Sequence, residues 1–440
     1  MARFGLPPQT ISDDPVPKSV IAYISVRGSE SVFDRKVKKL AKSAKAYHAK
    51  KGDRESVRRD LEKNGFRVLA ESALGLSVSA PAAAYEDITG GKLQPVERLI
   101  YSEGGHSEYS THLDIVGKNQ PESLGVGAVK SKTLKVDGIV LEKPRVYHAV
   151  FPSPIPVNSP KFHLRVPADV AVALNAVAAH QQGCRGAEVL VAMPDSGWYR
   201  HPYFTAQGCR VQTPIDVVPE TDRSKDPVGH GTGESANLFA VAPQCTLQPI
   251  RASNDQGDLV GAVAGFLKAK ELAPKIITNS WGGDGTYPPA GAPDQADLAF
   301  ATEIQDAIER GILVVFSAGN GQFSVEPQIP GVLAAGGVYM DQNGDCARPI
   351  TPAAIKARGS TGMSFRSSAV WSGCSRAPNT SCCQFRPTAK LIEPKASRRQ
   401  KIRRRMGRGR TMAGLCSPAR RPRRLRWPAQ LPCSSAPSPI

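Results

Sequence analysis

Three side chains in this sequence have the types that acyl transfer requires, and each lies within two residues of a glycine. Asp195 lies in Met-Pro-Asp-Ser-Gly, His230 in Gly-His-Gly-Thr, and Asn320 in Ser-Ala-Gly-Asn-Gly. A carboxylate can hold an imidazole in one tautomer, and an imidazole is the usual general base near neutral pH. An amide can donate a hydrogen bond to a developing oxyanion. These residues therefore predict nucleophilic attack on a carbonyl group.

Each of these residues also has an ordinary structural interpretation. Asp-Ser-Gly is common in turns, and a histidine can serve as a cap or a core residue. An asparagine between glycines often occupies a left-handed turn. The catalytic interpretation depends on the residues occurring together and in this order.

A fourth motif, Asn279-Ser280-Trp281-Gly282, follows an apolar segment and is itself followed by a glycine. An extended segment of this kind can pair with a substrate backbone as an added strand and can shape a side-chain pocket. We therefore expect Asn279, Ser280, Trp281 and Gly282 to bind substrate. The alternative is an ordinary buried strand and turn.

The elements around these motifs alternate between helix and buried strand from residue 163 onward. Helical periodicity covers 167–180, 230–240, 259–271 and 297–310, and short apolar segments predict strands at 188–193, 246–252, 275–279, 312–317 and 332–338. This alternation predicts an α/β fold, a doubly wound parallel sheet with helices on both faces. In such a sheet the working residues follow the carboxyl ends of strands, where Asp195, Asn279 and Asn320 stand.

The region before residue 161 is organised differently. Residues 1–17 are predicted to be an N-terminal extension, and 18–103 read as strand-helix-strand-strand-helix-strand, with the last strand at 92–101. That order is typical of a small ferredoxin-like α+β domain. Glycine, serine and proline interrupt 104–160, which we interpret as a linker and wrapping segment.

In this order, the four motifs closely resemble the subtilisin-like serine proteases (subtilases), over about 161–345. The resemblance implies that Asp195 orients His230, that His230 is the base, and that Asn320 belongs to the oxyanion hole. It also implies that Ser280–Gly282 form a wall of the primary specificity pocket, where Trp281 is bulkier than the aliphatic residue often found there.

The same resemblance carries expectations about cofactors and partners. The substrate would be a protein or peptide, and no cofactor would be required. Calcium often stabilises the family, but the sequence offers no convincing metal-ligand set. Residues 18–103 resemble, less specifically, the inhibitory propeptides of these enzymes, so an intramolecular propeptide is one interpretation and an unrelated recognition domain is the other.

The family pattern breaks after Asp345. The nucleophilic serine stands in Gly-Thr-Ser-x-Ala-Ala-Pro in this family, and no such segment follows Asn320. Ser364, in Gly-Met-Ser-Phe-Arg, is a superficial substitute that comes too soon after Asn320 and precedes an arginine. The peptidase domain at 161–345 is therefore incomplete as written.

Residues 346–440 have a different composition from the rest of the chain. They hold 21 of the 57 Lys and Arg residues, six of the nine Cys residues, and one acid, Glu393. The formal net charge of +18 thus arises in this segment, and the preceding 345 residues are close to neutral. We expect a disordered basic tail without a core of its own.

This composition is typical of GC-rich coding DNA read out of frame. When the reading frame is shifted by one base, Cys416–Ala429 permit F-S-G-T-S-A-A-A-P-Q-V-A-G, which contains the missing nucleophile motif. Its serine would span the codons of Arg420 and Arg421. We infer that one base was lost near the junction of Asp345 and Cys346, through a biological frameshift or a sequencing error.

We therefore predict a serine-type endopeptidase by family and an inactive product for this chain. One alternative is a pseudoprotease that binds peptides through Asn279–Gly283. The other is non-specific nucleic-acid binding through Arg398–Arg410 and Arg420–Arg426, with no specific nucleic acid as a partner.

Location is predicted only from what the sequence lacks. Met1–Pro17 is polar and proline-rich, without the apolar run of a signal peptide, and no stretch approaches the roughly 18 apolar residues of a membrane span. We expect a cytoplasmic protein without membrane contact. The three cysteines of the body indicate neither a disulfide framework nor a zinc site.

Overall fold

The computed structural model describes residues 10–34, 43–101, 107–121, 123–130, 134–148, 164–285, 293–319, 322–337, 339–340 and 346–347. The chain divides into two compact units, Met1–Ala389 and Lys390–Ile440, and all described residues belong to the first. Asn320 and the tail from residue 348 onward lie outside the described residues.

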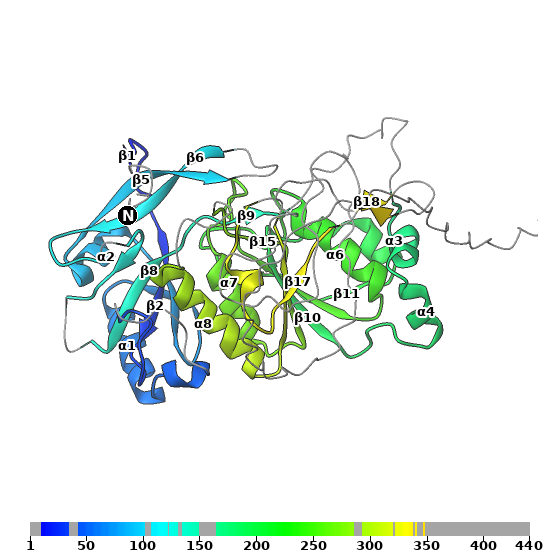
Figure 1. Cartoon of the computed structure of the whole chain (residues 1–440), viewed down its shortest axis with the longest axis horizontal. Helices are drawn as coiled ribbons and strands as arrows, with labels where there is room; N and C mark the ends of the chain where they lie inside the picture. The colour runs from blue at the N-terminus through cyan, green and yellow to red at the C-terminus, as the bar shows by residue number, and fades with distance from the viewer. Residues whose placement is uncertain are drawn as a thin grey trace, which may run out of the picture. The chain divides into compact units, whose positions relative to one another are not determined.

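The larger sheet has seven strands (Figure 1), and every strand pair in it is parallel. In spatial order the strands are β11 (Arg210–Val211), β13 (Thr246–Arg251), β10 (Leu190–Asp195), β14 (Ile276–Asn279), β16 (Leu313–Ser317) and β17 (Leu333–Ala335), and β12 (Ile215–Asp216) also pairs with β13. The predicted α/β class with a parallel sheet is confirmed.

Both faces of this sheet are buried, as the side chains of β10 show. Val191 and Met193 pack in one apolar cluster with Phe239 of α6 (His230–Val241). Ala192 points the other way and packs in a second cluster with α7 (Ala262–Glu271) and α8 (Gln295–Glu309). Successive residues of a strand face opposite sides, so an apolar run such as this one indicates a strand covered by helices on both sides.

The chain reverses its direction of travel across the sheet at β10. After β10 it passes to β13 on one side, and it then crosses back to β14, β16 and β17 on the other side. A crevice forms where neighbouring connections leave a parallel sheet in opposite directions, and ligands bind there, beyond the carboxyl ends of the strands. Asp195, the last residue of β10, lies at this point.

The helix predicted at 167–180 is two short helices, α3 (Ala168–Ala173) and α4 (Ala176–Gln181). Asn175 between them has a left-handed conformation with φ of 58°, which interrupts the helical hydrogen bonds. Asparagine tolerates this conformation better than most residues, and periodicity alone did not reveal the break. A further short helix, α5 (Pro202–Ala206), follows β10.

The N-terminal part of the chain forms an antiparallel five-stranded sheet with two helices. In spatial order its strands are β3 (Arg67–Glu71), β4 (Gly75–Ala80), β2 (Val20–Val26), β8 (Val136–Leu141) and β7 (Val126–Gly127), and its helices are α1 (Lys51–Lys63) and α2 (Ala82–Thr89). The first four strands have the order and directions of a ferredoxin-like sheet. That part of the predicted fold class is confirmed.

The predicted last strand of this domain was wrong. Residues 92–101 do form a strand, β5 (Lys92–Tyr101), but it pairs with β6 (Ser107–Val116) and β1 (Thr10–Ile11) in a separate three-stranded sheet. The position beside β2 is filled by β8, from the segment predicted to be a linker. The hairpin of β5 and β6 is an insertion before the fourth strand, and the apolar Val-Asp-Gly-Ile-Val-Leu of β8 completes the core.

Polar side chains of the N-terminal domain contact two buried acids on α8. The Tyr23 hydroxyl donates to Glu303 Oε1 at 2.7 Å, and the Ser72 hydroxyl donates to the same oxygen at 2.6 Å. His48 Nε2 lies 2.8 Å from Asp306 Oδ1. Lys270 of α7 contacts both acids and neutralises charge that would otherwise be buried without compensation.

Replacing Lys270 should therefore weaken the structure strongly. The Lys270→Met substitution leaves Glu303 and Asp306 buried without their main cation, and we expect the free energy of unfolding to fall by about 3–5 kcal/mol. Lys268→Met is the matched control, because Lys268 pairs with Glu271 near the surface and should contribute about 1 kcal/mol or less. Urea unfolding of the two variants measures the difference, and similar losses would contradict this account.

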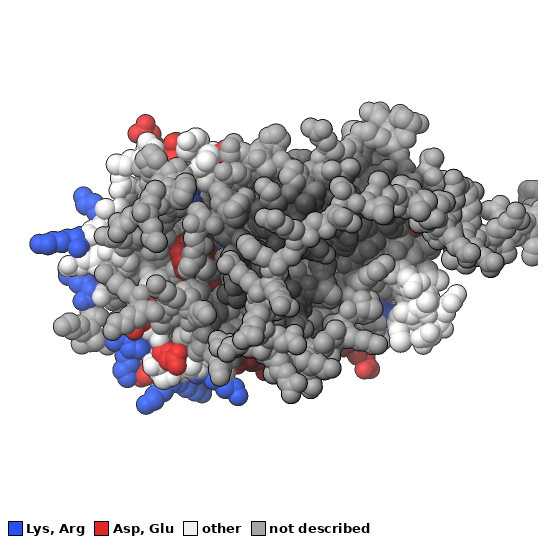
Figure 2. Space-filling model, in the orientation of Figure 1, with Lys and Arg blue, Asp and Glu red and all other residues white. Residues whose placement is uncertain are grey.

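The described surface carries charges of both signs. Figure 2 shows Lys and Arg side chains interleaved with Asp and Glu on the described part of the face it presents, around the position of α1 in Figure 1. None of the described helices is long and apolar enough to cross a membrane. Two short strands, β18 (Tyr339–Met340) and β19 (Cys346–Ala347), and two 3-10 turns, η1 (Ala44–Tyr47) and η3 (Glu326–Gln328), complete the described elements.

Candidate active site

Asp195 ends β10 and is almost completely buried, with 1% of its surface exposed. Its Oδ1 accepts a hydrogen bond of 2.7 Å from the backbone N–H of Ser196. Strand pairing on both sides of β10 fixes the backbone, so the carboxylate projects from a rigid element. A carboxylate held in this way can orient a neighbouring ring.

His230 is that neighbour. It is the first residue of α6, which follows Gly229 in a left-handed conformation, and its Nδ1 lies 2.7 Å from Asp195 Oδ1. Gly231 permits this approach, because a Cβ atom there would lie 2.3 Å from the Gly197 carbonyl oxygen. The glycines noted in the sequence on both sides of His230 thus have separate roles, one in the entry to the helix and one in its close packing.

The electrostatics of the pair favour a charged imidazole. Burial by itself lowers the pKa of His230, but the carboxylates of Asp195, Glu234 and Asp226 together outweigh it and raise the pKa to about 9. Nε2 makes no hydrogen bond to any described residue. With Nδ1 engaged by Asp195, Nε2 is the ring atom available to exchange a proton with a substrate or nucleophile.

Two residues that the sequence analysis did not single out position this pair. Asp226 accepts hydrogen bonds from the backbone N–H groups of Gly229 and Thr232 and thereby caps the first turn of α6. Ser196 accepts from the Gly231 N–H at 2.9 Å and donates to Asp226 at 2.7 Å. The run Asp-Pro-Val-Gly before His230 was the available sequence signal, since an aspartate just before a helix is a typical cap.

A strand from the segment predicted to be a linker lies against the substrate-binding motif. β9 (Val146–Tyr147) pairs antiparallel with β15 (Trp281–Gly282), and the His148 N–H donates to the Ser280 carbonyl oxygen at 2.9 Å. Arg145 pairs with Leu259 as an isolated antiparallel bridge. The segment 145–148 therefore occupies a groove between two backbone edges, in the manner of an added peptide strand.

The side chain of Tyr147 lies over the ring of His230. Its ring centroid is 4.9 Å from that of His230, and its hydroxyl donates to the Gly257 carbonyl oxygen at 3.0 Å. The ring covers the imidazole, so in this state the base is sheltered by the protein's own chain.

His148 occupies a pocket beside the same groove. Its Nδ1 lies 2.6 Å from Ser317 Oγ, at the end of β16. A Cβ atom on Gly282 would lie 2.7 Å from His148 Cε1 and 2.5 Å from Ser324 Oγ, so only glycine fits at that position. The pocket is thus formed by the residues around Gly282 and the carboxyl end of β16.

The predicted substrate-binding residues have different roles in the structure. The Ser280 carbonyl oxygen and the backbone of Gly282 pair with the segment 145–148. The Asn279 amide instead donates to the Val315 carbonyl oxygen inside the sheet at 2.9 Å. The indole of Trp281 is fully buried and donates to the Pro194 carbonyl oxygen at 2.8 Å, so only its backbone lines the groove. Asn320, the predicted oxyanion donor, lies outside the described residues.

The docking of this segment should depend on pH through His148. Burial lowers its pKa to about 4, against about 6.5 in an exposed histidine, so the docked ring is neutral. The charge of Glu326 raises this pKa, and that of His230 lowers it. Docking is then complete above pH 6.5, weakens as the pH falls toward 4, and should be about tenfold weaker at pH 5.5.

Hydrogen exchange of the 145–148 amides, corrected for the intrinsic effect of pH, measures this change. The His148→Gln chain is the control and should show no such loss on acidification. Burial raises the pKa of Glu142 to about 8, which acts in the opposite direction, so the difference between the two chains is the quantity to compare. Identical pH profiles would contradict a role for His148.

Within the described ranges, no group of three or more His, Cys, Asp or Glu side chains is arranged to hold a metal ion. Cys184, Cys209 and Cys245 are free thiols.

A buried Asp–His pair at the switch point of a doubly wound parallel sheet, beside a groove that holds an extended peptide, is the arrangement of a subtilisin-like domain. Comparison with known families agrees: residues 186–379 match the model of the subtilase family (Peptidase_S8). The matched range includes Asp195 and His230 and continues past Asp345.

The curated relatives are matched over part of their length. Subtilisin Savinase of Lederbergia lenta is 26% identical over 186 residues, which are 39% of this chain and 63% of that protein. The extracellular serine proteinase of Thermus sp. (strain Rt41A) is 28% identical over 144 residues, 31% of this chain and 32% of that protein. The solved structure of a lanthipeptide protease is 25% identical, with a TM-score of 0.29, over 34% of this chain and 45% of that one. The chain thus spans less than two thirds of these proteins.

Proposed function

We propose that this chain derives from a serine-type endopeptidase that cleaves peptide bonds by acyl transfer. The observation that carries the proposal is the 2.7 Å contact between His230 Nδ1 and Asp195 Oδ1, which leaves Nε2 without a hydrogen bond to any described residue, in a ring that packs against Tyr147 of the segment 145–148. The match of 186–379 to the subtilase family model supports the same chemistry.

The proton transfers follow from this geometry. A serine supplied by the intact frame would attack the peptide carbonyl, and His230 Nε2 would take its proton and return it to the leaving amine. Asp195 would hold the ring and stabilise the imidazolium that forms. Asn320 and the backbone N–H of the serine would hold the oxyanion, as the family resemblance implies.

The chain as written should be inactive, because residues 321–440 contain no Gly-Thr-Ser-x-Ala-Ala-Pro segment. Binding and oxyanion contacts without a nucleophile leave a rate only about 10³–10⁴ above that in water. The single-base loss near codon 345 explains the break, and sequencing codons 340–350 of the gene tests it. An intact, unshifted reading of that stretch would remove this explanation.

Assaying the purified 440-residue protein on a fluorogenic peptide tests the predicted inactivity. We expect a rate indistinguishable from that of its His230→Ala variant. Hydrolysis that the His230→Ala substitution abolishes would show that another residue supplies the nucleophile.

We further propose that residues 10–148 act as a built-in inhibitor of the propeptide kind. The domain contacts α8 through Glu303 and Asp306, and its last described residues fill the groove. The Glu142 side chain accepts a hydrogen bond from the Val263 N–H at the start of α7. This contact fixes the chain just before it enters the groove.

Peptide binding without turnover is the second candidate function. The groove of this chain holds an extended segment with paired backbone, although the sequence provides no family-type nucleophile. A chain derived from an endopeptidase can still bind peptides as a pseudoprotease after it has lost its nucleophile. Binding of a peptide with no cleavage over hours would favour the latter.

A further inference from the structure

The segment in the groove places one cation in a buried position that the catalytic pair does not require. Arg145 stands three residues before His148, and His148 would be the residue before the cleaved bond in a substrate bound this way. The Arg145 side chain is 8% exposed, and its Nη1 donates to Oε1 of Glu326, which is 3% exposed. The contact is a buried ion pair between the bound segment and the body of the domain.

Glu326 is held in place by the body of the domain. Its Oε2 accepts a hydrogen bond from the Ser324 hydroxyl, and Ser324 Oγ in turn accepts from the Gly283 N–H at 2.8 Å. Gly283 directly follows β15, the edge on which the segment pairs. The carboxylate is therefore fixed relative to the groove before any peptide binds.

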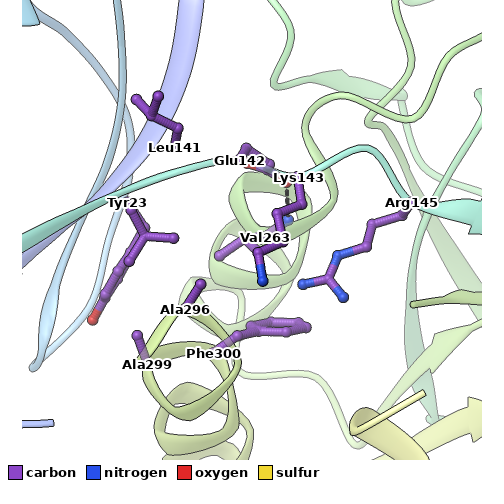
Figure 3. Close-up of a pocket in the computed structure, with 10 residues that line it drawn as sticks. Tyr23, Leu141, Glu142, Lys143, Arg145, Val263, Ala296, Ala299 and Phe300 are labelled. Carbon is purple, nitrogen blue, oxygen red and sulfur yellow. Dashed lines mark hydrogen bonds between the residues drawn. The ribbon is translucent and has the colours of Figure 1, made fainter. Parts of the chain in front are cut away.

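The surroundings of Arg145 suit a guanidinium group. Figure 3 shows its side chain extending toward Phe300 of α8, with the guanidinium carbon 5.5 Å from the ring centroid. A cation over an aromatic face is favourable, and the planar guanidinium gains more from it than an ammonium does. Burial lowers the pKa of Arg145, but Glu326, Asp297, Glu142 and Asp284 together raise it, so the group stays charged.

The carboxylate loses its counter-charge when the segment leaves. Arg145 lowers the pKa of Glu326 most strongly against its burial, ahead of the hydrogen bond from Ser324, and Arg145 belongs to the segment. A buried carboxylate without a partner is unfavourable, so the empty groove selects for a peptide that restores the charge. A neutral side chain at this position would leave Glu326 uncompensated, and an acidic one would repel it.

We propose that Glu326 is a specificity-determining residue that selects peptides with arginine at the fourth position before the cleaved bond, counted toward the N-terminus. The inference rests on the proposed function, since it assigns a substrate class to the same groove. Lys143, two residues further upstream, pairs with Asp294 at 2.6 Å, but that carboxylate is 36% exposed, so this position should discriminate less.

Fluorescence anisotropy on the full 440-residue chain tests this selection. The chain carries Arg145→Ala and Val146→Pro, which remove the guanidinium and an amide needed for strand pairing and so empty the groove. The probe is fluorescein-labelled Lys-Pro-Arg-Val-Tyr-His, the sequence of residues 143–148, compared with peptides that have Lys, Met or Glu in place of its Arg, and with one that has Met in place of its first Lys.

We expect the Arg peptide to bind at least tenfold more tightly than the Met peptide, with Lys between them and Glu weakest. Replacing the first Lys of the peptide with Met should lower its affinity by about threefold or less. In a chain that also carries Glu326→Gln, the Arg-to-Met ratio should fall below about threefold. The comparison of peptides on one protein does not depend on how well the Glu326→Gln variant folds.

Three outcomes separate the inference from the proposed function. Equal affinity of the Arg and Met peptides for the Arg145→Ala, Val146→Pro chain, in which Glu326 is intact, would overturn the inference. The groove would then still bind peptides, and the proposed function would stand. An Arg-to-Met affinity ratio that stays at tenfold or more in a folded Glu326→Gln chain would also overturn the inference, because another residue would then select the arginine. Binding of none of the peptides would overturn both, because the groove would then not receive extended chains.

Discussion

Restoring one base between codons 345 and 346 is expected to convert an inert chain into a peptidase. Residues 1–345 stay the same, so Asp195, His230 and the groove are unchanged, while the shifted reading supplies the serine motif in place of Cys416–Ala429. Removal of the serine from a triad of this kind lowers kcat by about 10⁶-fold, and we expect a gain of that order. Hydrolysis of a fluorogenic peptide by the 440-residue and reframed chains measures it.

The control for this result is the reframed chain with His230→Ala, which keeps the restored serine and core but lacks the base. It should return to the background of the 440-residue chain. A reframed chain that is folded, judged by circular dichroism and cooperative unfolding, and yet inactive would contradict the proposed chemistry.

Asp195→Asn in the reframed chain should lower kcat by about 10⁴-fold, because an amide can donate to Nδ1 and favour the wrong tautomer of the ring. Asp195 Oδ1 contacts both the Ser196 N–H and His230 Nδ1, so an amide in its place can satisfy only one of the two groups. The loss in kcat is measured on chains shown by circular dichroism to be folded, because the substitution also removes a charge that stabilises the fold.

The same substitution has a second consequence that does not depend on activity. Burial by itself lowers the pKa of His230, and the carboxylates around it raise the value to about 9. Removing the charge of Asp195 should lower that pKa. By linkage, the raised pKa stabilises the fold below pH 6.5, and this stabilisation is lost as the pH rises toward 9. NMR titration of the imidazole in the 440-residue chain, with and without Asp195→Asn, tests the direction, and an unchanged pKa would contradict the pairing.

The parallel sheet and the pairing of Asp195 with His230 were predictable because their signals are local. Each strand of the sheet is a short apolar run beside a helix of regular periodicity, and Asp195 and His230 stand in short glycine-flanked motifs. The position of β8 was not predictable in this way. Its pairing with β2 joins residues more than 100 positions apart, across an inserted hairpin, and local periodicity does not encode such partners.

The groove shows the same limit at the level of single side chains. The Ser280 carbonyl oxygen contacts the bound segment, whereas the side chains of Asn279 and Trp281, one residue to either side, point into the core. The motif identified the groove, but the direction of each side chain depends on strand register. Residues 145–148 were missed because prolines nearby suggested a linker, although Arg-Val-Tyr-His has the character of a short strand.

The protein's own chain lies across the proposed proteolytic site in the position of a substrate. N-terminal sequencing and the intact mass of the purified reframed chain test this most directly. We predict a cleaved product whose new N-terminus is Ala149, immediately after His148, and no cleavage in the His230→Ala control. An uncut chain with full activity on added peptide, or a new N-terminus elsewhere, would contradict the claim.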